Sequence, residues 1–249
     1  MSVSNYFKVM FGMAAFWVAI SFSSVYAREG SMLISIAHFV GNQQLQLDTV
    51  QYKNELNQPY TITKCKYYIG KIKLKKSTGG YYTLNDYYLV SEEEPASKQI
   101  VLKDVPKGEY TGMEFIIGVD SIDNCSGAQS GALDPVNAMF WTWNTGYIFL
   151  KMEGVSPVSK SPGNVFEYHI GGYKQPTNCI RTIALNFGSS IEIGDGKLPH
   201  ITLKADLEEV LENPHTIDFS KLSSVTDFHN ATLIADNYGN LFSILGVVP

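Results

Sequence analysis

Apolar and polar residues alternate at a period of two along most of this chain, and this alternation constrains its fold more than any other feature. Such a period places successive side chains on opposite faces of a β-strand, whereas a helix repeats every 3.6 residues. The alternating segments are rich in Tyr, Ile, Val, Thr and Phe and are bounded by turn residues. This pattern predicts an all-β fold, an antiparallel β-sandwich with long loops and a few short helices. The predicted strands are residues 32–40, 47–54, 60–74, 81–90, 99–105, 110–119, 166–173, 181–187, 189–194 and 200–207.

Helical patterns are scarce, and no boundary between domains is evident. Residues 206–213 predict a helical turn with Asp206 as a candidate cap, and residues 229–245 have apolar spacing that predicts a short C-terminal helix. The chain has no internal repeat and no linker of low complexity, so residues 28–249 are predicted to form one β-sandwich domain. No glycine-rich phosphate loop opens a helix, which argues against a nucleotide-binding fold.

The N-terminus has the pattern of a secretory signal peptide. Lys8 precedes an apolar run at residues 9–22, and small residues follow up to Ala27. The run is shorter than the roughly 20 residues that a transmembrane helix needs. We therefore expect residues 1–27 to be a signal peptide that is cleaved after Ala27. No cysteine lies near that point for lipid attachment, and we expect a periplasmic or secreted protein without a membrane anchor.

The charge of the chain limits its partners. The full chain carries a net charge of −5, and loss of Lys8 with the signal peptide makes the mature chain one unit more negative. A mildly acidic protein is a poor partner for nucleic acid or for an anionic membrane surface. We therefore expect no nucleic-acid partner.

Three cysteines, Cys65, Cys125 and Cys179, remain in the mature chain. An odd number in an oxidising compartment favours one disulfide and one free thiol. Cys125 and Cys179 both lie in polar, turn-rich loops, so a Cys125–Cys179 disulfide is the preferred pairing. The alternative is that all three thiols are free.

The chain lacks the common motifs of catalysis, including G-x-S-x-G, H-E-x-x-H and C-x-x-C. We therefore expect a binding protein rather than an enzyme. Among the histidines, His38 ends an apolar strand, and His169 precedes Gly171 and Gly172, where glycine permits a close approach of the backbone. His200 and His215 follow prolines and carry little functional weight. For any single histidine, an ordinary hydrogen-bonded place in the sheet is the competing interpretation.

Two tryptophans lie two residues apart in the run MFWTWNTGYIFLKMEG, which covers residues 139–154. In a strand, Met139, Trp141 and Trp143 point to one face. Three interpretations remain open: packing in the core, a stacking platform for sugar, and metal or redox chemistry at an indole.

The region around these tryptophans resembles the MbnP-like copper-binding family, exported proteins associated with methanobactin operons and with surface copper proteins of methane oxidisers. The likeness extends over most of the mature chain and includes AHFVGNQQL, KYYIGKIKL and ADNYGNLF. Its most specific features are a strand ending in Gly118-Val119, then Asn124, L-x-P at residues 133–135, M-F-W-x-W-x-x-G-Y at residues 139–147, and His169-Ile170-Gly171.

The resemblance implies a copper site built from histidine and from a tryptophan oxidised to kynurenine by a partner di-haem oxidase of the MbnH/MauG type. It assigns His169 as a ligand and Trp141 or Trp143 as the modified residue. The loop Asn124 is followed by Cys125 where the family pattern has a histidine. The resemblance therefore leaves Cys125 or His38 as the third partner. Imidazole and sulfur both suit copper.

Oxygen donors in the loop before the tryptophans support a second hypothesis. Asp120, Asp123, Asn124 and Asp134 are ligands of the kind that Ca²⁺ prefers, although their spacing is not that of an EF-hand. The competing interpretation is a turn in which these side chains cap backbone groups. For the whole protein, the alternative to a copper-binding function is a module that binds carbohydrate or another protein.

Overall fold

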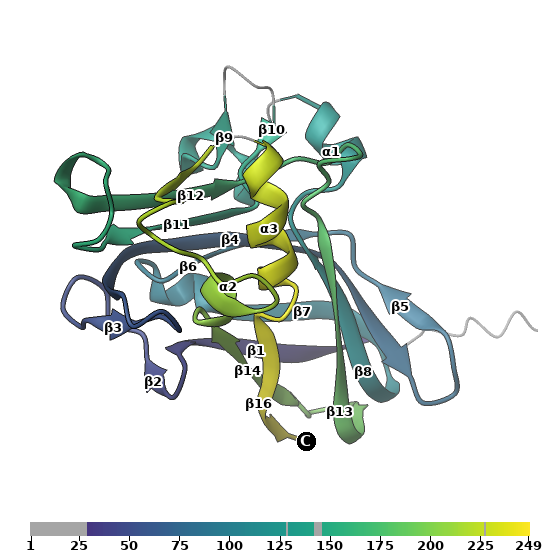
Figure 1. Ribbon diagram of the computed structural model, residues 1–249. Helices are drawn as coiled ribbons and strands as arrows, with labels where there is room; N and C mark the ends of the chain where they lie inside the picture. Colours follow the sequence, from purple (N-terminus) through teal and green to yellow (C-terminus); the bar gives the residue numbers. More distant parts are fainter. Residues whose placement is uncertain (1–28, 128, 142–145, 227) are drawn as a thin grey trace, which may run out of the picture.

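The structure is a computed structural model that describes residues 29–127, 129–141, 146–226 and 228–249. In those residues the strands form a five-stranded, a nine-stranded and a two-stranded sheet, arranged as a sandwich (Figure 1). The fold is all-β, as the alternation predicts. No helix in the described ranges is long and apolar enough to cross a membrane.

The five-stranded sheet has β1 at its centre. Its order is β16-β14-β1-β2, and β7 pairs with the other edge of β1. The strands are β1 (Glu29–Val40), β2 (Gln43–Gln44), β7 (Gln99–Pro106), β14 (His200–Asp206) and β16 (Phe242–Val248). β1 and β14 run parallel, which departs from the predicted antiparallel arrangement. Alternation of residues defines the faces of a strand but not the direction of its neighbour.

The nine-stranded sheet is organised on β4, the longest strand. Its main order is β13-β8-β4-β11-β12-β15, and three short strands also pair with β4. The members are β3 (Tyr52–Lys53), β4 (Pro59–Lys76), β5 (Tyr81–Thr83), β6 (Tyr87–Ser91), β8 (Gly108–Ile117), β11 (Leu150–Val155), β12 (Val165–Ile170), β13 (Arg181–Ile193) and β15 (Ser224–Val225).

Short helices and a small hairpin complete the fold. The hairpin joins β9 (Phe140–Trp141) and β10 (Gly146–Tyr147), and the α-helices are α1 (Ser121–Cys125), α2 (Glu209–Glu212) and α3 (Phe228–Tyr238). One-turn 3₁₀ helices are η1 (Pro95–Lys98), η2 (Gly131–Leu133), η3 (Pro135–Asn137) and η4 (Pro162–Asn164). The hairpin and α1 lie at the same end of the molecule (Figure 1).

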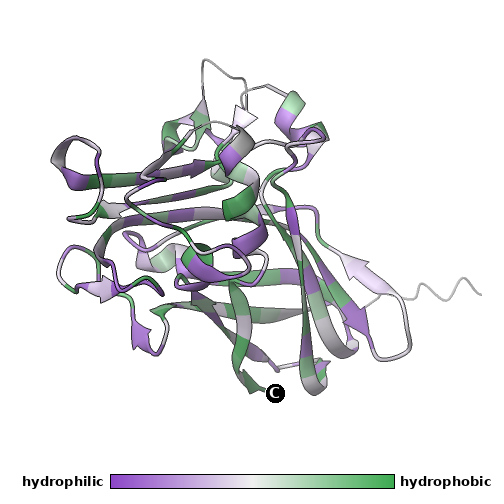
Figure 2. Cartoon of the chain, viewed as in Figure 1, coloured by the Kyte–Doolittle hydropathy of each residue, from purple (hydrophilic) through white to green (hydrophobic). Residues whose placement is uncertain are grey.

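Apolar side chains from both large sheets meet in a buried core. Phe242 of β16 packs edge-on against Phe115 of β8 and Tyr67 of β4, with ring centroids 5.1 and 5.7 Å apart. Hydrophobic and hydrophilic residues alternate along the strands (Figure 2). Removal of this apolar surface from water is the main force that holds the two sheets together.

Three local predictions are wrong. The predicted helix at 229–245 ends at Tyr238, after which Gly239 and Asn240 interrupt it and residues 242–248 form β16. Pairing with β14 outweighs the weak helical spacing there. Asp206 does not cap α2, because it ends β14 and its carboxylate accepts hydrogen bonds from the Gly41 and Glu208 amides. The predicted strand at 47–54 is reduced to β3.

Candidate functional site

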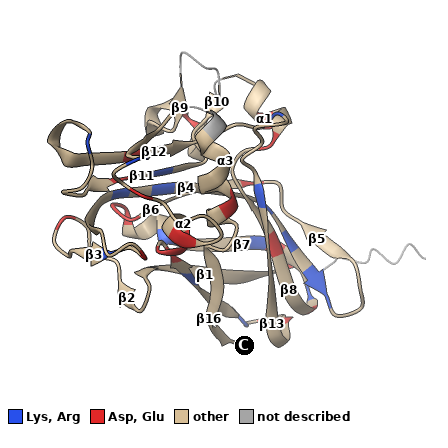
Figure 3. Cartoon of the chain, in the orientation of Figure 1, with Lys and Arg blue, Asp and Glu red and all other residues tan. Residues whose placement is uncertain are grey.

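His169 lies on the outer face of the nine-stranded sheet. Along β12 its neighbours Tyr168 and Ile170 are buried, so His169 points the opposite way. It stands opposite Lys151 of β11, which in turn stands opposite Lys66 of β4. Charged residues lie along β4 and β11 (Figure 3), and Lys66 and Lys151 are among them.

Glu153 holds the imidazole of His169 in place. The Nε2 atom of His169 is 2.8 Å from Oε1 of Glu153, and the Nζ atom of Lys64 is 3.2 Å from Oε2 of the same carboxylate. Burial acts to raise the pKa of Glu153, but the hydrogen bonds from His169 and Lys64 outweigh it and hold that pKa below its ordinary value. An ionised Glu153 therefore orients His169.

Trp141 packs against the turn that follows His169. A Cβ atom on Gly171 would lie 2.6 Å from Cζ3 of Trp141 and 2.5 Å from the carbonyl oxygen of Tyr147. Only glycine leaves room for this contact, as the glycine pair after His169 predicts. Gly171 is the second residue after His169 and lies just beyond the end of β12, so the indole packs against the turn that leaves this strand.

A second contact brings the segment before Trp141 to this face. The Nζ atom of Lys151, the neighbour of His169, donates a hydrogen bond of 2.6 Å to the carbonyl oxygen of Ala138. Burial, together with the nearby Lys64 and Lys66, lowers the pKa of Lys151. Trp141 therefore packs beside the turn that follows His169, and the segment before Trp141 is hydrogen-bonded to Lys151, the neighbour of His169 on β11.

The burial of Trp141 bears on one of the three interpretations of the tryptophan pair, the platform that stacks against sugar. Its side chain is 8% exposed and belongs to the hydrophobic core, and Met139 is fully buried. A sugar-stacking platform needs an exposed ring, so Trp141 does not provide one. Trp143 lies outside the described residues.

His38 does not join His169. It is 2% exposed and faces the interior between the sheets, where Nε2 lies 2.7 Å from the hydroxyl of Tyr67 and Nδ1 lies 2.6 Å from Oε2 of Glu92. Tyr67 is on the inner face of β4, and His169 is on the outer face of the same sheet. The two imidazoles are therefore separated by the sheet, and His38 is not the third partner expected from the resemblance.

Cys125 and Cys179 are not bonded to each other in the structure, which differs from the preferred pairing. Cys125 is exposed at the end of α1, where its thiol lies 3.3 Å from the hydroxyl of Tyr173. Cys179 is buried, and its Sγ atom faces the carbonyl oxygen of Thr177. The arrangement in which Cys65, Cys125 and Cys179 are all free, the alternative left open by the sequence, is the one observed.

The oxygen donors of the predicted calcium loop bind groups of the protein itself. Asp120 caps α1 by accepting hydrogen bonds from the Ile122 and Asp123 amides, and Asp134 caps η3 in the same way. The ammonium of Lys71 is 2.8 Å from Asp123 and 3.3 Å from Asp120. This geometry matches the capping interpretation of the loop.

Asn124, the fourth donor of that loop, joins α1 to the hairpin. Its Nδ2 atom donates to the carbonyl oxygen of Val119, and its Oδ1 atom accepts from the Tyr147 amide at 3.0 Å. Asn124 is 3% exposed. The side chain thereby positions Cys125 at the same end of the molecule as Trp141.

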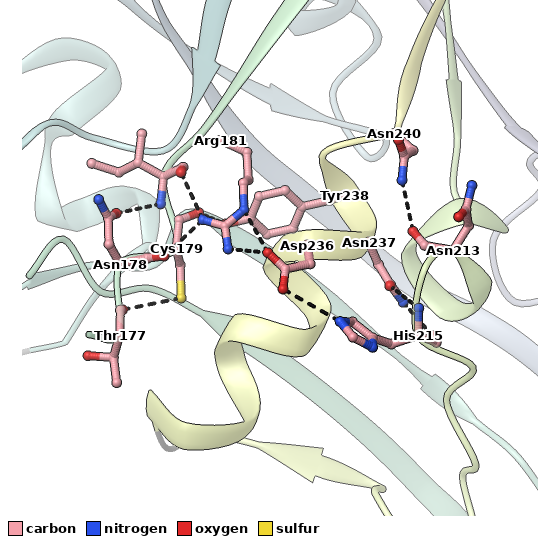
Figure 4. Close-up of polar contacts among 11 residues, drawn as sticks. Thr177, Asn178, Cys179, Arg181, Asn213, His215, Asp236, Asn237, Tyr238 and Asn240 are labelled. Carbon is pink, nitrogen blue, oxygen red and sulfur yellow. Dashed lines mark hydrogen bonds and ion pairs between the residues drawn. The ribbon is translucent and has the colours of Figure 1, made fainter. Parts of the chain in front are cut away.

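A second polar cluster joins α3 to β13 and to the loop after α2 (Figure 4). Asp236 accepts hydrogen bonds from the guanidinium of Arg181 and lies 3.5 Å from Nε2 of His215. Asn237 accepts from the His215 amide and donates to the His215 carbonyl oxygen. These bonds anchor α3 to β13 and to the loop after α2, a structural role that agrees with the low weight given to His215.

The polar partners of His169 could not be predicted from the sequence. Glu153 stands two residues after Lys151 in the tryptophan-containing run, and alternation places both on one face. Their meeting with His169 depends on the register of β11 against β12, which a single sequence does not reveal. In the described ranges, no group of three or more His, Cys, Asp and Glu side chains is placed to hold a metal ion.

Comparison with known proteins places the chain in a family. No curated protein matches it. Among solved structures, MbnP from Methylosinus trichosporium has a similar fold, with a TM-score of 0.54 and 14% sequence identity over 78% of this chain and 80% of that chain. The sequence model of the MbnP family matches residues 29–229, which include the nine-stranded sheet and every strand of the five-stranded sheet except β16. The chain belongs to the MbnP family.

Proposed function

We propose that this protein is an exported copper-binding protein whose site contains His169 and a modified Trp141. The observation that carries the proposal is the packing of the Trp141 indole against Gly171, the second residue after His169. This packing supports a shared site, because it brings the tryptophan to the turn that follows the histidine, although β11 and a long loop separate the two residues in the sequence.

The hydrogen bonding of His169 supports a role as a ligand. An ionised Glu153 accepts a hydrogen bond from Nε2–H, and in this tautomer the lone pair of the ring is on Nδ1. Metal-binding histidines commonly donate their other ring N–H to a carboxylate, which fixes the tautomer and strengthens the ligand. No hydrogen bond to Nδ1 is present among the described residues, so this atom is available to copper.

Oxidation of Trp141 would add the ligand that side chains alone do not provide. Opening of the indole with two oxygen atoms from water releases four electrons, for which we propose a partner di-haem oxidase as the acceptor. Hydrolysis then releases one carbon as formate and leaves kynurenine, with an aniline nitrogen and a carbonyl beside His169. Nitrogen ligands of this kind suit copper. The thiol of Cys125, held at the same end of the molecule through Asn124, is the proposed third partner.

The test is expression of the full chain in its native host, followed by intact mass and copper analysis of the mature protein. Kynurenine in place of tryptophan raises the mass by about 4 Da. Peptide mapping then assigns the change to Trp141 or to Trp143. An unmodified mass together with the absence of bound copper would refute the proposal.

Variants test the ligand assignment separately. His169→Ala should abolish copper binding, and Glu153→Gln should weaken it about 10–100-fold because the imidazole loses its orienting carboxylate. His215→Ala is the matched control, since His215 lies in the cluster on α3 and also pairs with a carboxylate. Equal copper content in the wild type and the three variants would show that His169 is not a ligand.

A further inference from the structure

A second feature of the outer face is a pocket beside β6. It has a volume of about 630 Å³ and lies between β6, η1 and the loop that carries η2 and η3. Pockets for small organic molecules commonly have volumes of about 300–1,000 Å³. Its residues take no part in the contacts among His169, Glu153 and Trp141 described above.

Ser91 gives this pocket an unsatisfied hydrogen-bonding group. The residue lines the pocket, is 3% exposed, and its hydroxyl has no hydrogen-bond partner among the described residues. A buried hydroxyl without a partner destabilises a protein by about 1–3 kcal/mol. Rotation of the Ser91 side chain toward the pocket would let this hydroxyl donate to an oxygen of a bound molecule.

Two further donors line the pocket. Ser91 pairs in register with Lys66, so their side chains leave adjacent strands on the same face. Gln99 also lines the pocket, and because its Oε1 accepts from Ser35, its amide nitrogen is left as a donor. An ammonium, a hydroxyl and an amide N–H₂ together favour a carboxylate, which accepts at both oxygens.

The remaining wall is suited to an apolar body. Tyr87 and Leu89 project from the same face of β6 as Ser91, and Val136 of the opposite loop is 82% exposed at the rim. The ring of Tyr87 is fixed by hydrogen bonds from its hydroxyl to Asp123 and from the Asp120 amide. A flat ring lies well against a rigid aromatic and aliphatic wall.

We propose that this pocket binds a small aromatic carboxylate, with its carboxylate between Lys66 and Ser91 and its ring against Tyr87 and Leu89. Two acidic residues weaken the attraction of the pocket for an anion. Glu93 lies 3.5 Å from the ammonium of Lys66 and shares it, and Glu94 lines the pocket and repels an anion. Removal of the Glu94 charge should therefore strengthen binding.

The pocket adjoins the candidate metal site without depending on it. Ala138 lines the pocket, and its carbonyl oxygen accepts the hydrogen bond from Lys151, the neighbour of His169. A ligand bound here would thus lie behind the segment that carries Trp141. Binding should nevertheless occur in metal-free protein, so failure of the copper proposal would leave this one intact.

The experiment measures binding of benzoate to metal-free protein by ligand-observed NMR and by calorimetry, with neutral benzamide as the comparison ligand. Benzoate should bind, and benzamide should bind at least tenfold more weakly. Ser91→Ala and Lys66→Gln should each weaken benzoate binding about tenfold, equivalent to about 1.4 kcal/mol. Glu94→Gln should strengthen it.

Lys64→Gln is the matched control, because Lys64 lies on the same strand and face but pairs with Glu153 outside the pocket. Its affinity for benzoate should equal that of the wild type, and circular dichroism should show that every variant is folded. Two results would overturn the proposal: no detectable benzoate binding at about 10 mM ligand, far above the affinity range of specific sites, or an unchanged affinity in folded Ser91→Ala and Lys66→Gln.

Discussion

The contact between Trp141 and Gly171 depends on a residue that has no side chain. The backbone there approaches the indole and the Tyr147 carbonyl oxygen so closely that any Cβ atom would overlap both. The carbonyl belongs to the backbone of β10 and cannot rotate away as a side chain would. The geometry of the candidate site is therefore sensitive to this single position.

We predict that Gly171→Ala lowers the free energy of unfolding by about 1–3 kcal/mol, because overpacking forces neighbouring groups to move. Gly246→Ala is the control, since a Cβ atom on Gly246 meets no atom within 4 Å. Urea denaturation measures both variants. Equal stability of the two would show that the backbone near Trp141 adapts freely.

His38 is a residue whose charge state should affect stability. Burial lowers the pKa of His38 below its ordinary value of 6.5, even though Glu92 acts to raise it. The neutral imidazole fits its contacts, because Nδ1–H donates to Glu92 and Nε2 accepts from the Tyr67 hydroxyl. Burial raises the pKa of Tyr67, so this hydroxyl remains protonated.

The pH dependence follows from that lowered pKa. Below about pH 6.5 the unfolded chain binds a proton at His38 that the folded chain does not, so stability falls as pH decreases, by up to about 1.4 kcal/mol per pH unit. Urea denaturation between pH 7.5 and 5 should show a steeper loss in the wild type than in His38→Gln. Parallel curves would mean that His38 protonates equally in both states.

At the scale of elements, α1 is linked to two neighbouring segments by one buried side chain. The helix has five residues and is too short to be stable alone. Buried Asn124 binds the Val119 carbonyl oxygen and the Tyr147 amide, and so links the end of β8 to the hairpin. The sequence marks Asn124 as a calcium donor or a capping residue, but its partner in β10 appears only in the fold.

We predict that Asn124→Ala lowers the free energy of unfolding by about 2 kcal/mol or more, because two buried backbone groups lose their partners. Asn240→Ala provides the comparison, since Asn240 is exposed and makes one hydrogen bond to the Asn213 carbonyl oxygen. Its effect should stay below about 1 kcal/mol. Chemical denaturation measures the free energy of unfolding of both variants. A decrease in Asn240→Ala as large as that in Asn124→Ala would contradict the role given to Asn124.

The same scale shows how far the sequence predicts the structure. The strands with strong alternation, such as β1, β4 and β8, are predicted because their core-facing residues repeat at a period of two. The end of α3 and the strand β16 are not, because β16 is an edge strand whose pattern is weak and whose stability comes from β14. A local sequence pattern does not reveal the stability that a strand gains by pairing with a strand distant in the sequence.

At the scale of the whole molecule, the number of free thiols shows whether a disulfide joins loops that are distant in the sequence. Cys125 is exposed, whereas Cys65 and Cys179 are buried. Burial raises the pKa of Cys179 to about 12, and burial also raises that of Cys65, so neither forms the reactive thiolate.

We predict that one thiol per native chain reacts with a thiol reagent and that two more react after unfolding without a reductant. The melting temperature should be the same with and without dithiothreitol. Titration that finds a single thiol in the unfolded chain would instead establish a disulfide.

The pairing of strands across the whole molecule also explains which features of the site could not be predicted from the sequence. The run with Trp141 and the motif with His169 are each recognisable in the sequence, and the packing of Trp141 against Gly171 brings the two segments side by side. The roles of His38 and Glu153 are decided by which sheet, face and register each strand adopts. Those choices are made by long-range packing and not by neighbouring residues.

The parallel pairing of β1 with β14 also determines when this protein can complete its fold. β1 starts at Glu29, and its neighbours on that side, β14 and β16, are formed by the last 50 or so residues of the chain. Joining such distant segments requires the closure of a very large loop, which slows folding. Until residues 200–206 arrive, one edge of β1 has unpaired N–H and C=O groups that another chain can occupy. A newly made chain that still lacks residues 200–206 is therefore open to aggregation at this edge.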